Sequence, residues 1–295
     1  MTLANVILLV LKTRLFLSVM AIGLKATLSD TTYLFRRPAQ LMRALLSINV
    51  FMPLIALMMA ATFDLDPAVK IALVTLSVSP VPPVMPHKAL QAGGREEYTI
   101  GLFTAGLILS VAIIALTLEL FDQLGNVPLR MSARSIALTV AVMTVLPLTI
   151  GIILRAVLPV VGDRAARPLS LISLVLLVIS FLPVLFGMFS SMLVLIGDGT
   201  LFDLGAFAVV GLVVGHLFGG PLPEDRTVLS LATSSRHPAI AATIAHVNFP
   251  NEKLAIAAVF LYLIISGILF IPYLKWVKRS QAKSDPVTRK KPAAV

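Results

Sequence analysis

A histidine and a lysine stand inside one of the long apolar runs of this chain, where ionisable side chains are costly and mark functional positions. Residues 77–94 read SVSPVPPVMPHKALQAGG, with four prolines ahead of or beside His87 and Lys88. Each proline removes a backbone donor and clashes with the carbonyl four residues earlier, so no continuous helix passes through this stretch. Inside a membrane, non-helical backbone is tolerated only where it is buried in protein or lines a watery cavity. We therefore interpret the stretch as part of a site, with a surface loop as the alternative.

A second polar cluster lies at the centre of another apolar run. Residues 226–248 read RTVLSLATSSRHPAIAATIAHVN, and the centre of this run holds Ser234, Ser235, Arg236 and His237. The proline that follows them is expected to break the helix there. An arginine at the centre of a spanning segment costs about 3 kcal/mol even on insertion scales, so it must face a partner, a cavity or a ligand.

Positive charge is the property that the two clusters share. Lys88 and Arg236 lack an obvious carboxylate partner in the sequence, and His87 and His237 stand beside them. Helix N-termini at the breaks add to an anion-binding field. This pattern favours a binding site for an anion. Two alternatives stay open: Lys88 extends to the cytoplasmic face, and Arg236 serves as a structural donor to the carbonyls of a broken helix.

Catalytic and metal-binding patterns are missing from the sequence. The chain has no cysteine, which excludes disulfides, thiol catalysis and thiolate metal sites. The spacing of His237 and His246 is not a recognised metal motif, and neither H-E-x-x-H nor an acid-rich D-D-x-x-D motif occurs. We therefore expect no catalytic residue, no metal and no cofactor. An intramembrane enzyme that uses Lys88, Arg236 and the histidines as acid–base groups is the weaker alternative, because no nucleophile–base pair accompanies them.

Composition predicts an all-α, polytopic membrane protein. The 295 residues are 58% hydrophobic and only 13% charged, and the mean hydropathy is +0.98. Soluble domains carry about 25% charged residues. The formal net charge of +10 would suggest nucleic acid in a soluble protein. Here it reflects membrane topology, and we expect no nucleic-acid partner.

About nine apolar runs of bilayer length follow one another along the chain. The two broken runs are the third and the eighth, which fits two inverted repeats of about five helices with the first repeat lacking its leading helix. Interrupted spans at matching positions of two halves indicate a transporter's binding site. The runs are residues 5–27, 41–62, 68–90, 98–121, 134–160, 168–196, 203–222, 226–248 and 253–276.

The charges of the loops predict the orientation in the cell membrane. Cations concentrate in the loop after the first span, in the loop after the fifth span and in the polar tail at 278–295, whereas loops 62–70 and 197–203 are acidic. Basic loops mark the cytoplasmic side. The C-terminus is therefore predicted to be cytoplasmic and the N-terminus to lie outside, as an odd number of spans requires. The basic residues are Lys25, Arg36, Arg37, Arg43, Arg155, Arg164, Arg167, Lys275, Lys278, Arg279, Lys283, Arg289, Lys290 and Lys291.

Several stretches, taken in order and with their spacing, carry a resemblance to a known family. They are VMAIGLKATLSDTTYLFRRP (Val19 to Pro38), Phe51-Met52-Pro53, the proline that opens the first break, GHLFGGPLPED (Gly215 to Asp225), and the eighth span up to Phe249. Together they resemble the bile acid:sodium symporter family in its bacterial, nine-span version, over about Leu15 to Trp276.

The resemblance implies two helix groups that move against each other. Residues 1–30 and 133–197 would form a panel, and residues 41–121 and 203–277 would form a core that contains the broken spans 68–90 and 226–248. The two broken helices would cross at mid-membrane. The substrate would lie between panel and core, and alternating access would come from their relative movement.

The chain departs from the family where sodium binds. Alignment on Phe249 places Ala232 where sodium-coupled members have an acid, and Arg236 and His237 where they have a glutamine and an asparagine. A guanidinium donates hydrogen bonds and accepts none, so it cannot serve as a sodium ligand. Asn49 is one of few neutral polar residues near the expected crossing. The coupling ion is therefore expected to be a proton or none, rather than sodium.

The sequence predicts a secondary transporter that moves a small organic anion by alternating access. Its expected partners are that anion and the lipid bilayer. The alternatives are the intramembrane enzyme and a channel, and a channel would show neither saturation nor counterflow. The predicted substrate-binding residues are Lys88, Arg236, His87, His237, Ser234, Ser235 and Asn49.

Overall fold

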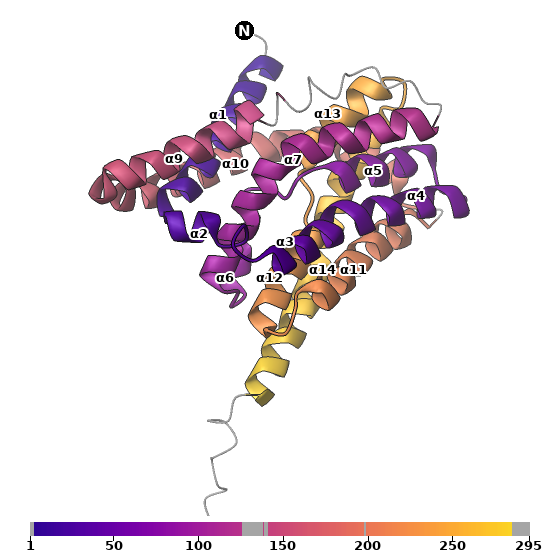
Figure 1. Ribbon diagram of the computed structural model, residues 1–295. Helices are drawn as coiled ribbons and strands as arrows, with labels where there is room; N and C mark the ends of the chain where they lie inside the picture. Colours follow the sequence, from indigo (N-terminus) through magenta and orange to yellow (C-terminus); the bar gives the residue numbers. More distant parts are fainter. Residues whose placement is uncertain (1–2, 126–137, 139–140, 198, 285–295) are drawn as a thin grey trace, which may run out of the picture.

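The structure is all-helical, as the composition predicts. The computed structural model describes residues 3–125, 138, 141–197 and 199–284, and these contain helices and connecting turns but no strand (Figure 1). The first half comprises α1 (Leu3–Lys25), α2 (Leu28–Thr32), α3 (Pro38–Leu45), the π-helical segment η1 (Leu46–Phe51), α4 (Met52–Thr62), α5 (Pro67–Val78), α6 (Met85–Gln91) and α7 (Glu96–Gly125). The second half comprises the π-helical segment η2 (Ala141–Val145), α9 (Leu146–Val157), α10 (Pro159–Leu195), α11 (Thr200–Phe218), α12 (Pro223–Ser234), α13 (Pro238–Asn248) and α14 (Leu254–Ser284).

Proline sets the start of several helices. A proline at the first helical position loses nothing, because its missing N–H would have no intrahelical partner there. At α5, the carboxylate of Asp66 also accepts a hydrogen bond from the backbone N–H of Ala68, at 2.7 Å. The helices that begin with proline are α3, α5, α10, α12 and α13.

Five helical stretches of the described chain are long and apolar enough to cross a membrane, so the protein is a multi-pass membrane protein. Each predicted broken span consists of two short helices, and neither helix of such a pair reaches bilayer length alone. The count of nine spans and the inverted repeats remain predictions. The five stretches are Pro38–Thr62, Glu96–Ile113, Pro159–Leu195, Thr200–Phe218 and Leu254–Gln281.

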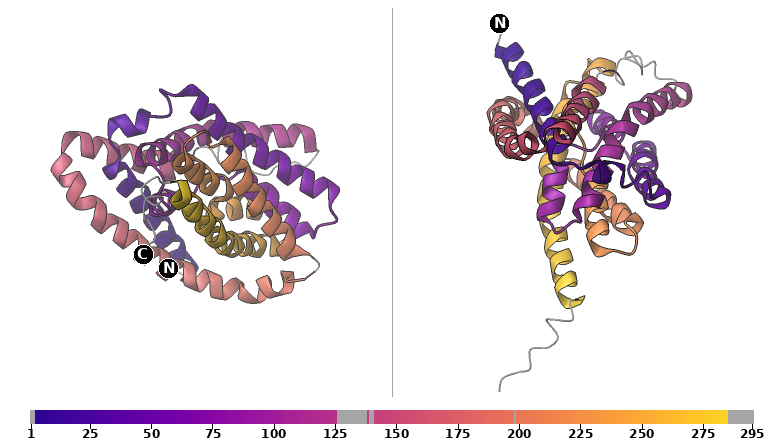
Figure 2. Two further views of the ribbon diagram at one scale, coloured as in Figure 1. Left: turned by 90° about the horizontal axis from the view of Figure 1, so that it is seen from below. Right: turned by 60° about the vertical axis from the view of Figure 1, so that its left-hand side comes forward.

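Three helices form a group on one side of the molecule. α1 packs against α9 and α10 (Figures 1 and 2). A Cβ atom on Gly23 would lie 2.5 Å from the carbonyl oxygen of Leu148, and one on Gly151 would lie 2.4 Å from that of Met20. Glycine therefore permits the close approach of α1 and α9, as small residues do between membrane helices.

These three helices lie within the predicted panel, residues 1–30 and 133–197, of which residues 1–2, 133–137 and 139–140 lie outside the described residues. The division into panel and core remains a prediction. The predicted tail at 278–295 continues α14 as far as Ser284, and the rest of it lies outside the described residues.

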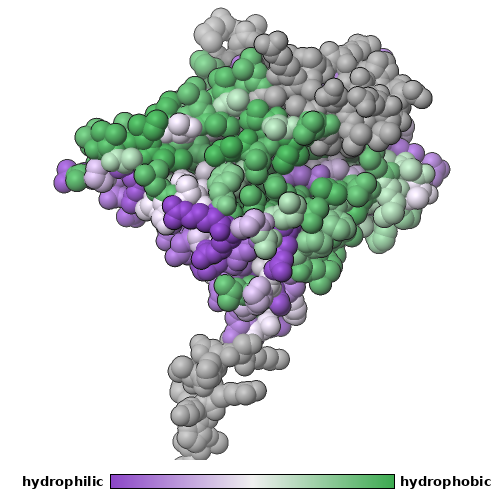
Figure 3. Space-filling model, viewed as in Figure 1, coloured by the Kyte–Doolittle hydropathy of each residue, from purple (hydrophilic) through white to green (hydrophobic). Residues whose placement is uncertain are grey.

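On the face drawn in Figure 3, apolar residues form a broad band, and hydrophilic residues gather mainly below it, over α2, α6 and the start of α12. Phe186 of α10 and Phe202 of α11 are 76% and 78% exposed, as expected of side chains that face lipid. α10 also bends along the edge of the molecule (Figure 2, left) and contains Pro168 and Pro183.

Candidate functional site

The two helix breaks contact each other. α5 ends at Val78 and α6 begins at Met85, while α12 ends at Ser234 and α13 begins at Pro238. The backbone N–H of His237, in the second break, donates to the carbonyl oxygen of Pro80 and to Oγ of Ser79, both in the first break and both at 3.1 Å. The two interrupted segments therefore form one polar region in the interior of the helix bundle.

Arg236 fastens three segments together through their carbonyl oxygens. Its side chain is buried, with 2% of the residue exposed. Nη1 donates to the carbonyls of Ser77 and Ser79, at 3.2 and 3.3 Å. Nη2 donates to the carbonyl of Ile48 in η1, at 3.1 Å. The carbonyls at the end of α5 have no intrahelical partner, so the guanidinium supplies donors that the break requires.

A cavity of about 300 Å³ lies beside the two breaks. α1 and α10 form part of its wall, through residues such as Leu11, Arg14 and Phe181. The rest of the wall comes from both breaks and from α14, where Phe260 and Phe270 line it. The cavity therefore lies between the group formed by α1, α9 and α10 and the helices that carry the breaks.

The cavity is lined by cations without a neighbouring acid. Arg14, Lys88 and Arg236 are the cations that line it, His237 lies beside them, and no aspartate or glutamate of the described residues lines it. None of the four forms an ion pair within the part of the chain that the structure describes. Nζ of Lys88 lies 5.7 Å from the centroid of the Phe270 ring, within the range of a cation–π contact. The net charge of the wall favours an anion.

Three buried nitrogen atoms of the lining residues have no hydrogen-bond partner. They are Nε of Arg14, Nε of Arg236 and Nε2 of His237. Nδ1 of His237 accepts a hydrogen bond from the backbone N–H of Ile240, at 3.4 Å, so the neutral ring carries its proton on Nε2. A buried donor without an acceptor lowers stability by about 1–3 kcal/mol. An anionic group in the cavity would provide acceptors for such donors.

The two serines of the second cluster have different surroundings. Ser235 lines the cavity with Arg236. Ser234 instead packs against neighbouring helices: its hydroxyl donates to the carbonyl of Ala208 at 2.9 Å, and its own carbonyl accepts from the Tyr262 hydroxyl at 2.6 Å. These contacts give Ser234 a structural position between α11 and α14.

The remaining two predicted residues lie away from the cavity lining. His87 is exposed, and its Nε2 lies 3.0 Å from Nε2 of Gln91, one helical turn further along α6. Asn49 lines a separate and smaller hollow together with Pro80 and Ser110. Of the seven predicted binding residues, the structure brings Lys88, Arg236, His237 and Ser235 around one cavity, and it does not bring Asn49, His87 or the Ser234 hydroxyl there.

Arg14 is a cavity residue that the sequence analysis did not select. The signal was present, because Lys12 and Arg14 both interrupt the first apolar run, and an ionisable residue within a span is a site candidate by default. Only the fold distinguishes the two, since Arg14 lines the cavity and Lys12 is exposed.

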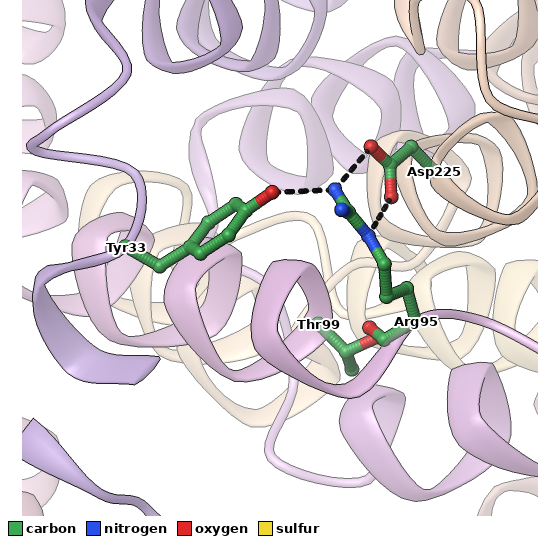
Figure 4. A network of polar contacts seen from close by, with 4 residues as sticks. All are labelled: Tyr33, Arg95, Thr99 and Asp225. Atoms are coloured by element: carbon green, nitrogen blue, oxygen red, sulfur yellow. Dashed lines mark hydrogen bonds and ion pairs between the residues drawn. The ribbon is translucent and has the colours of Figure 1, made fainter. Parts of the chain in front are cut away.

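A further polar cluster lies between the end of α2 and the start of α12, where the hydrophilic residues gather, and Figure 4 shows it from close by. Nε and Nη2 of Arg95 donate to the two carboxylate oxygens of Asp225, at 3.1 and 2.8 Å, and Nη2 also donates to the Tyr33 hydroxyl, at 2.5 Å. Asp225 is 1% exposed. Burial raises the pKa of its carboxyl, and the hydrogen bond and the positive charge of Arg95 oppose that rise. This cluster joins α12 to α7 and to the loop after α2.

One family is similar in sequence to this chain. The profile described as the sodium bile acid symporter family matches residues 13–195, which is more than half of the sequence. The match includes α1 from Thr13 onward, the first break and α10, and it ends before Arg236 and His237. Among curated proteins, none matches. The chain, with its apolar spanning helices and its cavity between two helix groups, belongs to the sodium bile acid symporter family, a family of membrane transporters.

Proposed function

We propose that this protein is a secondary transporter that moves a small organic anion by alternating access. The observation that carries the proposal is the cavity between the two helix groups. Arg14, Lys88, Arg236 and His237 line it, and no carboxylate of the described residues does. Several apolar side chains complete the wall, including Phe181 and Phe270. An anion with an apolar body matches both kinds of lining.

The placement of the cavity supports alternating access. Its wall is shared between α1 and α10 on one side and the two breaks and α14 on the other. A movement of one group against the other therefore changes the shape and the exposure of the cavity. Opposed broken helices with a site between them are the arrangement expected of transporters built from inverted repeats.

The position of Arg236 supports transport without sodium at the family's usual sites. Three backbone carbonyl oxygens converge on its guanidinium, from Ser77, Ser79 and Ile48. Backbone carbonyls are ligands that membrane proteins use for monovalent cations. Here the guanidinium of Arg236 already donates hydrogen bonds to these carbonyls. Nearby Ala232 is fully buried and offers no oxygen from its side chain. A proton or no coupling ion is therefore favoured over sodium.

The basic loops support an orientation with the C-terminus in the cytoplasm and the N-terminus outside, in the cell membrane. The hydrophilic end seen in Figure 3, over α2, α6 and the start of α12, would then face the cytoplasm. A reporter fused after Ser284 that is active only outside the cytoplasm would contradict this orientation.

A thermal-shift screen of the purified protein against small carboxylates and sulfonates tests the function. A ligand at a hundred times its Kd stabilises the folded state by about 2.7 kcal/mol, so a cognate anion raises the Tm. The shift is expected to be equal in sodium and potassium salts at the same ionic strength. Stabilisation by organic cations but not by anions would contradict the proposal, and a shift that requires sodium would contradict its ion coupling. A channel, the alternative within transport, would show no counterflow of the ligand found.

A further inference from the structure

Arg14 brings a guanidinium to the cavity from the α1 side. It lines the cavity, its Nε is buried without a partner, and it has no ion pair in the described part of the chain. The Ser173 hydroxyl of α10 donates to the backbone carbonyl of Arg14, at 3.1 Å. This bond joins α1 to α10 at the level of the cavity. Arg14 is therefore expected to move with the group formed by α1, α9 and α10.

The other cations belong to the helices that carry the breaks. Arg236 is fastened by its three carbonyl contacts and cannot turn away from the cavity without breaking them. Lys88 lines the cavity from the last turn of α6. Positive charges on both helix groups thus face one cavity, and no acid among the described lining residues neutralises them. Arg236 is buried and Arg14 is half-buried, so water screens the repulsion between these two charges less than it screens the charge of the exposed Lys88.

We propose that Arg14 completes the anion site from the α1 side, and that the facing cations make this carrier an exchanger of organic anions. The proposal rests on the function proposed above. Closure of the cavity brings the charge of α1 toward the charges at the breaks. A bound anion between them removes the repulsion, and an empty cavity does not. The carrier therefore changes between its outward-facing and inward-facing states only when an anion is bound. As a result, one anion enters as another leaves.

Exchange across liposomes that contain the purified full-length protein tests this inference. The probe is radiolabelled naphthalene-2-sulfonate, which is charged at every working pH and has an aromatic body for the cavity's phenylalanines. Efflux of internal probe is measured into unlabelled probe or into gluconate at equal ionic strength. Potassium and valinomycin hold the membrane potential at zero. External probe is expected to accelerate efflux about tenfold, which corresponds to a barrier about 1.4 kcal/mol lower for the loaded carrier than for the empty one.

Substitution of Arg14 is expected to uncouple the exchange. Arg14→Gln removes the charge on the α1 side, so efflux into gluconate rises and its ratio to exchange approaches one. Arg14→Lys keeps the charge and is expected to keep the wild-type ratio. The matched control is Lys12→Gln, which removes an exposed cation of the same helix and leaves the ratio unchanged. The external probe is kept at a saturating concentration for each variant, so that the lower probe affinity expected of Arg14→Gln does not by itself change the ratio.

Each outcome of the experiment separates the inference from the function on which it rests. Wild-type efflux that is equally fast into probe and into gluconate would overturn exchange and leave anion transport standing. A wild-type ratio in folded Arg14→Gln would overturn the role of Arg14. Absence of both efflux and probe binding would contradict the anion site itself. The wild-type comparison needs no variant, so exchange is tested even if Arg14→Gln does not fold.

Discussion

Two arginines of this protein hold its broken spans in place, but only one of them has its charge neutralised. Arg95, at the hydrophilic end, pairs with both oxygens of Asp225 and contacts Tyr33. Arg236, between the two breaks, donates only to backbone carbonyls. Both contact sets join segments far apart in sequence. The difference is that the first set cancels its charge, whereas the second leaves a positive charge beside the cavity. Structural fastening and an anion-attracting field can therefore come from the same side chain.

The largest effect is expected from Arg236→Ala. It leaves the carbonyls of Ser77, Ser79 and Ile48 without their donor, and unsatisfied buried acceptors cost about 1–3 kcal/mol each. We expect a loss of stability of about 3–5 kcal/mol, measured as a lower Tm in detergent. Guanidinium ion at low concentration is expected to raise the Tm of the variant, because it supplies the missing donors, while the wild type gains nothing.

A Tm of Arg236→Ala equal to that of the wild type would show that the carbonyl contacts contribute little to stability. It would contradict the structural role of Arg236 and leave Arg95 as the only one of the two arginines with such a role. The milder Arg236→Gln keeps one amide donor at the break. It is expected to remain folded in membranes, to be less stable than the wild type and to bind anions more weakly. Rescue of Arg236→Ala by sodium instead of guanidinium would indicate that the carbonyls form an ion site once the side chain is removed.

An intermediate effect is expected from Asp225→Asn. It keeps the shape of the side chain and removes the charge that Arg95 requires. Hydrogen bonds to charged groups contribute about 1.5–3 kcal/mol, so a stability loss of about 2 kcal/mol is expected, without a change in anion affinity. The control is Asp163→Asn, since the Asp163 side chain is 64% exposed in its pair with Arg155, and an exposed pair is worth at most about 1 kcal/mol. Equal losses in the two variants would contradict the buried role of Asp225.

The smallest effect on stability is expected from Lys88→Met. The side chain of Lys88 donates no hydrogen bond within the described part of the chain, and its charged group lies at the cavity near the Phe270 ring. We expect an unchanged Tm and an affinity for the screened anion that is weaker by about tenfold, in line with one charge-assisted contact. Binding isotherms of the screened anion for Lys88→Met and for the control Lys12→Met measure this difference in affinity. Equal affinity in both would show that Lys88 extends to the cytoplasmic face and does not serve the site.

Much of the helical architecture could be predicted from the sequence, because it depends on local properties. Proline chemistry placed the breaks close to where α5 and α12 end. The predicted run 253–276 begins one residue before α14, which starts at Leu254. The π-helical segment η1 was not predicted, although Pro53 lies in the first turn of the helix that follows it. Short π-helical turns occur within α-helices, but the spacing of apolar residues does not reveal where they occur.

The contacts of the candidate site could be predicted only in part, because they depend on which helices become neighbours. The sequence indicated that Arg236 needs a partner and left two roles open, and the structure shows carbonyl contacts together with a position on the cavity. Ser234 and Ser235 were both predicted to bind the substrate, but only Ser235 lines the cavity. Neighbours along a broken helix face different directions, and no pattern of residue types specifies which one faces the cavity.

The bonds from Arg236 also determine when this protein can complete its fold. The acceptors Ile48 and Ser79 precede Arg236 by 188 and 157 residues. At synthesis rates of about 5–20 residues per second, the first broken span enters the membrane roughly 10–30 s before its donor is made. During that interval its free carbonyls must be hydrated or held by the insertion machinery, since lipid offers them no hydrogen bond. Release of a nascent chain truncated before Arg236 would therefore leave a span that the bilayer does not retain in its native form.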